Sequence, residues 1–242
     1  QPHICSLYKN TQWAESWPTE FATESIFELG VYPNEGDLGN SSLGAMYRKA
    51  GHGSSSILGY FTASTSFLDK LSEDADDVRW SIMAADELSE TSTHPGKRLG
   101  ASYKYSGSTG LAGDKKSANS TAVNIKVIRL SELYLIAAEA ALEKNAPDRQ
   151  KSANYLNEIR KRSPNLPAAS AANITMNMIE EERSKELFTE GHRFFDMIRW
   201  NKTITFDDDL GAISTIHREK SIDRTFYKTI LPIPLDQINA NP

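Results

Sequence analysis

The chain has 242 residues, of which 39% are hydrophobic and 24% are charged, and its formal net charge at pH 7 is −5. These values are typical of a globular chain that buries a core, and they exclude a disordered or fibrous protein. The acidic balance argues against a nucleic acid as partner, because proteins that bind nucleic acids usually carry a clustered excess of Lys and Arg.

No segment of the sequence reaches the roughly 20 apolar residues that a helix needs to cross a bilayer. The longest apolar run, residues 133–142, is interrupted by Glu139. The sequence begins at Gln1 without a basic and then apolar leader, so we expect any targeting segment to lie outside it. The single cysteine, Cys5, has no partner for an internal disulfide and indicates no redox compartment.

Residues 1–120 are rich in Gly, Ser, Thr, Asn and aromatic residues, which predicts loops and short elements. Residues 25–31 are expected to form a strand, and residues 67–71 a helical turn. Residues 32–56 and 94–120 predict long loops, and long loops in compact domains are often functional. We therefore expect this half of the chain to face a ligand.

Residues 121–242 change to a helical period, after a short alternating run at 123–127 that predicts a strand. Residues 130–142 carry apolar side chains on most sides of a helix, which we expect to be enclosed by neighbours. Asp148 is placed to cap a second helix, which ends before Pro164. The two helices together predict a helical hairpin.

A third and longer helix is predicted for residues 176–200, because apolar residues follow one helical stripe through Phe188 and Phe194. Gly191 lies on this stripe, although a glycine costs about 1 kcal/mol in a helix interior. We therefore expect another backbone to approach closely at that position. The end of the chain, residues 226–242, is expected to be extended, because prolines punctuate it.

Three segments of the second half carry patterns of a known family, in the order that the family has them. Residues 127–140 are Val-Ile-Arg-Leu-Ser-Glu-Leu-Tyr-Leu-Ile-Ala-Ala-Glu-Ala. Residues 181–200 are Glu-Glu-Arg-Ser-Lys-Glu-Leu-Phe-Thr-Glu-Gly-His-Arg-Phe-Phe-Asp-Met-Ile-Arg-Trp. Residues 231–242 are Leu-Pro-Ile-Pro-Leu-Asp-Gln-Ile-Asn-Ala-Asn-Pro, with Gln237 in place of the usual acid. Together these segments resemble the SusD/RagB family of outer-membrane nutrient-binding lipoproteins.

The resemblance implies a mainly α, SusD-like helical fold with a tetratricopeptide-like helix pair, long loops and a few short strands. Residues 121–242 would form its helical core, and residues 1–120 its loop-rich, ligand-facing part. The family's amino-terminal helical region, with its signal peptide and lipidated cysteine, would lie outside this chain. Before residue 120 the resemblance is weaker and rests on residues 24–28, 77–80 and 103–105.

The same resemblance implies a function. The protein would be non-catalytic and without a cofactor, and it would bind an extracellular nutrient, foremost a glycan or oligosaccharide. Its protein partner would be a SusC-like TonB-dependent transporter. It would be located at the extracellular face of the outer membrane, attached only through a lipid anchor outside this chain.

Loop aromatics of the first half are the candidate binding residues. Sugar rings present apolar C–H faces that stack on Trp or Tyr, while Asn and Arg bond the hydroxyls. The expected platform and its polar companions are Trp13, Trp17, Tyr32, Asn34, Asn40, Tyr47, Arg48 and Tyr60. Taken singly, each is more often a core or incidental surface residue, so the prediction concerns the region rather than one side chain.

Two other functions stay open on the sequence. A glycoside hydrolase would use two carboxylates, such as Glu28, Glu35 or Asp37. A tetratricopeptide-like interaction adaptor would use the hairpin at residues 129–163, although a single repeat does not build the usual concave surface.

We expect neither a catalytic residue nor a bound metal. His192 and Asp196 lie one turn apart on the predicted third helix, but the amphipathic stripe of that helix accounts for their spacing. The five histidines show no paired-ligand spacing, and no cysteine cluster joins them. The acidic runs at 73–77 and 207–209 lack the ligand alternation of a calcium loop, so solvated turns are expected there.

Overall fold

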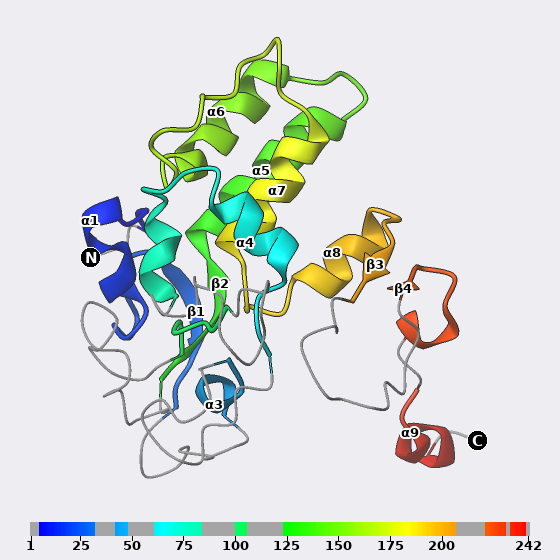
Figure 1. Ribbon diagram of the computed structural model, residues 1–242. Helices are drawn as coiled ribbons and strands as arrows, with labels where there is room; N and C mark the ends of the chain where they lie inside the picture. Colours follow the sequence, from blue (N-terminus) through cyan, green and yellow to red (C-terminus); the bar gives the residue numbers. More distant parts are fainter. Residues whose placement is uncertain are drawn as a thin grey trace. The chain divides into compact units, whose positions relative to one another are not determined.

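The computed structural model describes residues 5–31, 42–47, 61–83, 100–105, 123–206, 221–230 and 233–240. The chain divides into two compact units, Gln1–Glu190 and Gly191–Pro242 (Figure 1). The boundary that the sequence suggested at residue 120 falls inside the first unit. Helices dominate the described residues, and the strands are short, so the mainly α fold class is confirmed.

Three helices pack side by side in the first unit (Figure 1). They are α5 (Leu130–Glu143), α6 (Arg149–Arg160) and α7 (Met176–Glu186). Their shared core includes the fully buried Leu135, Leu156 and Ile179. The carboxylate of Asp148 accepts a hydrogen bond from the backbone N–H of Lys151 at 3.0 Å and so caps α6. The predicted helical hairpin is confirmed by α5 and α6.

The loop-rich first half has a core of its own. Its elements are α1 (Asn10–Trp13), η1 (Ala14–Ser16), β1 (Ser25–Leu29), α3 (Leu43–Tyr47), α4 (Thr65–Leu71) and η3 (Val78–Ile82). Trp13, Trp17, Leu68 and Tyr103 are buried together in that core. The predicted strand and helical turn are confirmed by β1 and α4, and the hydroxyl of Ser64 caps α4.

A two-stranded ribbon connects this first half to the helices. β1 pairs antiparallel with β2 (Ile125–Arg129), which runs directly into α5. Glu28 lies opposite Lys126 in the ladder, and the Lys126 ammonium donates to the Glu28 carboxylate at 2.9 Å. The register shifts on both sides of Phe27, so the ribbon is bulged.

The expected single helix over residues 176–200 is wrong. α7 ends at Glu186, and α8 (Arg193–Arg199) begins only after a turn. In that turn Thr189 and Gly191 have φ angles of 65° and 85°, which lie outside the right-handed helical region. Within the described part of the chain, no atom outside its own neighbours lies within 4 Å of the place where a Cβ on Gly191 would sit. The glycine therefore serves the turn, and the expected close approach of another backbone is wrong.

The second unit contains short elements: α8, β3 (Ile204–Thr205), β4 (Ser221–Ile222), η7 (Tyr227–Thr229) and α9 (Leu235–Ala240). β3 and β4 pair antiparallel. The expectation of an extended chain end is corrected by α9. The carbonyl of Pro234 accepts hydrogen bonds from the N–H groups of Gln237 at 2.9 Å and Ile238 at 3.2 Å, because a proline fits the start of a helix.

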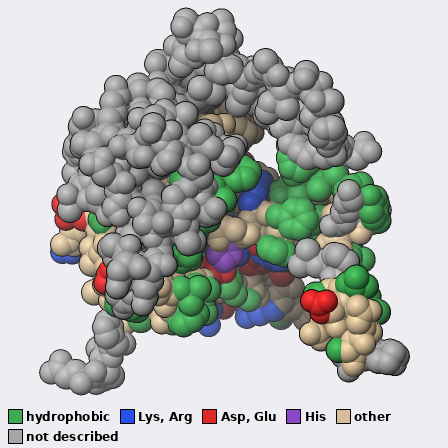
Figure 2. All heavy atoms as spheres, turned by 90° about the horizontal axis from the view of Figure 1, so that it is seen from below, with side chains coloured by type: hydrophobic (Ala, Val, Ile, Leu, Met, Phe, Trp, Pro, Cys, Tyr) green, Lys and Arg blue, Asp and Glu red, His purple; other side chains and the backbone are tan. Residues whose placement is uncertain are grey.

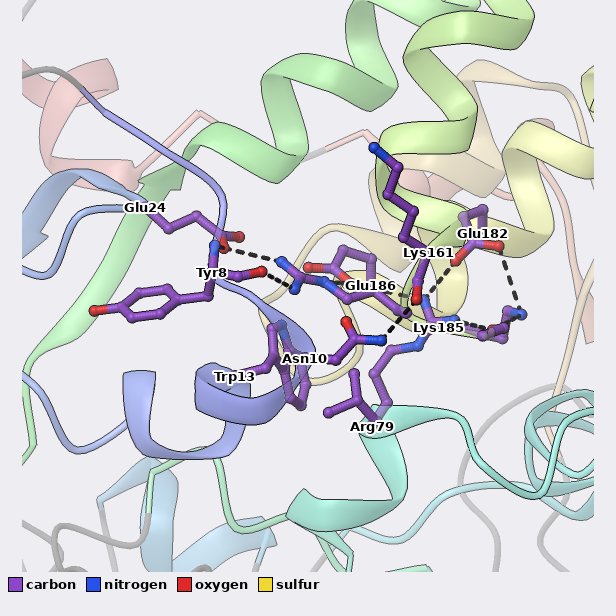
Figure 3. A network of polar contacts seen from close by, with 12 residues as sticks. Tyr8, Asn10, Trp13, Glu24, Arg79, Lys161, Glu182, Lys185 and Glu186 are labelled. Carbon is purple, nitrogen blue, oxygen red and sulfur yellow. Dashed lines mark hydrogen bonds and ion pairs between the residues drawn. The ribbon is translucent and has the colours of Figure 1, made fainter. Parts of the chain in front are cut away.

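Charged side chains fill much of the interior of the first unit, and we call this group the ionic core. It consists of Glu24, Asp77, Arg79, Lys104, Arg129, Arg162, Glu182, Lys185, Glu186 and Glu190, whose side chains are all buried. Arg129 bonds Glu24 at 2.7 Å, Glu186 at 3.1 Å and Glu190 at 2.7 Å. In Figure 3 the carboxylates of Glu24, Glu182 and Glu186 turn toward the cations around them.

The acidic run at 73–77 is not the solvated turn that we expected. Asp77 is buried and accepts bonds from the Arg79 guanidinium at 2.8 and 2.6 Å. Asp74 is buried as well, and its carboxylate accepts bonds from the backbone and side-chain N–H groups of Asn165, both at 2.8 Å. Buried carboxylates need such partners, so this segment ties the first half to the loop after α6.

Cations hold two carboxylates of the ionic core, Glu186 and Glu190, in the charged form. Burial by itself raises the pKa of Glu186, but the charges of Arg129 and Arg162 outweigh burial and hold that pKa at about 2. Burial also acts to raise the pKa of Glu190, which Arg129 and Lys104 hold below its ordinary value. Burial lowers the pKa of Lys104 to about 8 against the opposing charge of Glu190.

Acid should therefore destabilise the fold in a window set by these pKa values. A carboxylate with a lowered folded-state pKa stabilises fully above its unfolded-state pKa, and this contribution is lost as pH falls through the folded-state value. For Glu186 the two values are 4.5 and about 2. We expect the free energy of unfolding, from urea denaturation at stepped pH, to fall most steeply between them. A Glu186→Gln variant should show a shallower fall, and an unchanged slope would contradict this account.

Removal of Arg129 should cost far more stability than removal of an exposed cation. Arg129→Met leaves the carboxylates of Glu186 and Glu190 buried without their shared partner, so we expect a loss of about 3–5 kcal/mol. Lys161→Met is the matched control, because Lys161 bonds Glu158 at 2.6 Å while its side chain is 65% exposed. The control should lose less than about 1 kcal/mol. Equal losses in urea denaturation would show that the ionic core does not stabilise the fold.

Substitution of Gly191 tests the turn between α7 and α8. Gly191→Ala meets no clash, so it isolates the penalty of a left-handed φ on a residue with a Cβ, about 1–2 kcal/mol. Asn201 has a φ of 56°, so Asn201→Gly should cause no loss of stability. Thermal denaturation measures both variants. A neutral Gly191→Ala would contradict the assignment of this turn.

Candidate functional site

Three aromatic rings come together in the first unit, and we call Tyr47, Phe61 and Tyr105 the aromatic group. Tyr47 ends α3, Phe61 lies in the segment before α4, and Tyr105 follows the buried Tyr103. The ring centroids of Tyr47 and Phe61 are 5.5 Å apart, and those of Tyr47 and Tyr105 are 6.4 Å apart. Residues from separate parts of the sequence thus form one aromatic cluster.

Backbone hydrogen bonds hold the aromatic group in place. The N–H of Phe61 donates to the carbonyl of Met46 at 3.0 Å, which ties the segment before α4 to α3. The hydroxyl of Tyr105 donates to the carbonyl of Thr189 at 3.3 Å, in the turn after α7. The Phe61 backbone and the Tyr105 ring are therefore each tied by a hydrogen bond to another part of the unit.

The aromatic group presents one open ring beside two covered ones. Phe61 is 53% exposed, whereas Tyr105 is 3% exposed. Burial raises the pKa of Tyr47, and burial together with the nearby charge of Glu190 raises that of Tyr105, so both phenols stay neutral at physiological pH. On the face shown in Figure 2, apolar side chains reach the surface beside charged ones. An open aromatic face suits a ligand with apolar C–H faces, such as a sugar ring.

Trp13 and Trp17 are core residues in this structure and not an open platform. Trp13 is 0% exposed and Trp17 is 2% exposed, and their rings meet edge to face with centroids 5.6 Å apart. The ammonium of Lys104 lies 4.4 Å from the centroid of the Trp17 ring. Both rings therefore line the ionic core, where cation–π attraction offsets part of the desolvation of the cations. Stacking on a ligand needs an open face, which neither ring has.

Tyr47 is the predicted binding residue that lies in the aromatic group, where it is half-buried. The other predicted residues lie outside the described part of the chain: Tyr32, Asn34, Asn40, Arg48 and Tyr60. Phe61 was not among the predicted residues. A signal for it was present in the sequence, because Phe61 directly follows Tyr60 in a stretch rich in polar residues.

Glu28, one of the three candidate carboxylates of a hydrolase, lacks the environment of a general acid. Glu28, a candidate acid of the hydrolase reading, bonds the Lys126 ammonium at 2.9 Å. Burial acts to raise the pKa of Glu28, but its hydrogen bonds lower that pKa overall. A general acid needs a raised pKa, so Glu28 does not fit the role. The other two candidates, Glu35 and Asp37, lie outside the described residues.

His192 and Asp196 make contacts typical of residues in a helix. The N–H of Asp196 donates to the carbonyl of His192 at 3.0 Å, and the Asp196 carboxylate pairs with Arg199 at 3.0 Å. Among the residues that the structure describes, no three His, Cys, Asp or Glu side chains converge as metal ligands do. In the same residues no helix is both long and apolar enough to cross a membrane.

The chain is similar to proteins of one kind. A SusD superfamily protein of Bacteroides vulgatus ATCC 8482 is 31% identical with a TM-score of 0.76, covering 98% of this chain and 49% of that one. The surface glycan-binding protein A of Bacteroides thetaiotaomicron shares the fold at 21% identity and a TM-score of 0.63, covering 99% and 54%. The SusD-like protein P25 of Formosa agariphila is 31% identical over 129 residues, or 48% of this chain and 22% of that one. This chain thus spans about half the length of the solved relatives.

A model of the SusD family matches residues 86–242. This range includes the three segments whose patterns resembled the family, at residues 127–140, 181–200 and 231–242. The solved SusD superfamily relatives agree with the match. The resemblance inferred from the sequence is therefore confirmed, and the chain belongs to the SusD family.

Proposed function

We propose that this chain is part of a non-catalytic protein that captures a glycan at a bacterial cell surface. Its membership in the SusD family supports this function. A protein of the same fold is described as a surface glycan-binding protein. Which glycan is bound depends on the chemistry of the ligand-facing side chains rather than on the fold.

The open ring of Phe61 beside Tyr47 is the observation that carries the proposal. A ring that is 53% exposed and packs beside Tyr47 offers an apolar face to the C–H side of a sugar. The ring does not need to be ordered by the ligand, because its backbone is already bonded to α3. A preorganised surface binds with a smaller loss of conformational entropy.

The ionic core supports this surface from inside the unit. Lys104 precedes Tyr105 and donates to the Glu190 carboxylate at 2.6 Å and to the Glu186 carbonyl at 2.9 Å. These bonds fix the backbone on which Tyr105 stands. The cations hold Glu186 and Glu190 ionised at neutral pH, so neither carboxylate carries a proton for the cleavage of a glycosidic bond. Capture without cleavage fits this arrangement better than hydrolysis.

Delivery to a transporter and location at the outer membrane are part of the proposal. The captured glycan would pass to a SusC-like TonB-dependent transporter, and a lipid anchor would hold the protein at the outer face of the outer membrane. The hairpin of α5 and α6 would then contact the transporter rather than the glycan. An adaptor function for this hairpin alone has weaker support, because one helix pair builds no concave surface.

Substitution of Phe61 tests the binding face. We expect Phe61→Ala to raise the Kd for the bound glycan about tenfold, equal to about 1.4 kcal/mol, because the stacking face is lost. Phe21→Ala is the matched control, because Phe21 is 56% exposed and lies outside the aromatic group. Titration calorimetry against starch, xylan, laminarin and alginate measures both variants, with released reducing ends assayed in the same mixtures.

Binding without released ends, weakened by Phe61→Ala and not by Phe21→Ala, is the expected result. Release of reducing ends would replace capture with hydrolysis. Binding that survives Phe61→Ala unchanged would remove the aromatic group from the site while leaving glycan capture in place.

A further inference from the structure

The ribbon of β1 and β2 is apolar on its outside and charged on its inside. Its exposed side chains are Ile26, Phe27, Leu29, Val127 and Ile128, each between 38% and 49% exposed. Its buried side chains are Glu28, Lys126 and Arg129. A ribbon with one face in water usually has the opposite pattern, with apolar residues inside and polar residues outside.

The pairing of the two strands places the charged side chains inside and the apolar ones outside. The Glu28–Lys126 pair at 2.9 Å fixes both charges on the inner side, and Arg129 ends β2 inside the ionic core. Because neighbouring residues of a strand point to opposite faces, Phe27 and Leu29 must point outward while Glu28 points inward. The bulges on either side of Phe27 bring more apolar side chains to the outer face.

The apolar surface continues into α5, which follows Arg129 without a break. Leu133 and Ile136 are 42% and 45% exposed, and Ala140 is exposed in the next turn. These three positions lie on one stripe of the helix, where a water-facing helix would carry charged residues. We call this stripe and the outside of the ribbon the outer face.

The length of the solved relatives bears on what could cover the outer face. This chain accounts for 49% of one relative and 54% of another, so a SusD-family polypeptide is about twice as long. A contiguous apolar surface of this kind marks an interface. We propose that the outer face is an internal interface, covered by the other half of a longer SusD-family polypeptide. The inference does not depend on the proposed glycan function.

The buried charges of the ribbon fix its register. A shift of the strands therefore cannot bury the apolar side chains in place of a covering partner. A slip of one residue would expose Lys126 and Arg129 and bury Phe27, which would break the ion pairs of the ionic core. The ribbon therefore keeps its apolar side chains on the outside. Its outer face is complementary to an apolar partner surface.

Thiol labelling tests the proposal. In a Cys5→Ser background, Leu29→Cys and Ile136→Cys place thiols on the outer face, and Asn154→Cys places one on the exposed polar side of α6. Reaction with Ellman's reagent is measured in the 242-residue chain and in the complete product of its gene. We expect all three thiols to react at similar rates in the 242-residue chain. In the complete product the first two should slow about 100-fold, with Asn154→Cys unchanged.

Equal rates in the two proteins would overturn the proposal. Slow labelling in the 242-residue chain together with a doubled mass in light scattering would also overturn it, because a second copy would then be the occupant. Thermal denaturation of Leu29→Ser gives an independent measurement. Its melting temperature should fall by about 5 °C in the complete product and stay unchanged in the 242-residue chain.

Discussion

The first unit depends on the burial of Arg129 among carboxylates from distant parts of the chain. Its guanidinium, at the end of β2, bonds Glu24 before β1 as well as Glu186 and Glu190 around the end of α7. Each of these carboxylates would be costly to bury without a cation, so none of the three segments is stable in its place alone. This constraint joins a loop-rich half and a helical half, which differ in composition, into one compact unit.

The same constraint gives a physical reason for two of the sequence patterns that resemble the family. The segments at 127–140 and 181–200 supply Arg129, Glu182, Glu186 and Glu190 to the ionic core. These charged residues form a buried structural interior, in which the pKa values of Glu186 and Glu190 are held below their ordinary range. The ligand surface that we propose lies elsewhere, at the aromatic group. The ionic core supports it through Lys104, which directly precedes Tyr105.

Sequence patterns predicted the local elements well and the tertiary partners poorly. The hairpin of α5 and α6 follows from helical periodicity and the Asp148 cap, which are properties of neighbouring residues. The break after Glu186 was missed, because the apolar stripe continues through it and a positive φ at Gly191 leaves no mark on periodicity. Trp13 was misplaced for a different reason. A composition typical of loops hides a second core, whose members meet only in three dimensions.

The central claim is that a glycan binds at the aromatic group without being cleaved. The most direct test is an NMR titration of the chain, with labelled aromatic side chains, against an oligosaccharide of the glycan that it binds. The account predicts saturable shifts of the Phe61 and Tyr47 ring signals, little change at the buried Trp13, and an unaltered oligosaccharide spectrum after prolonged incubation. Saturable shifts elsewhere with Phe61 and Tyr47 unmoved, or the appearance of cleaved sugar, would contradict it.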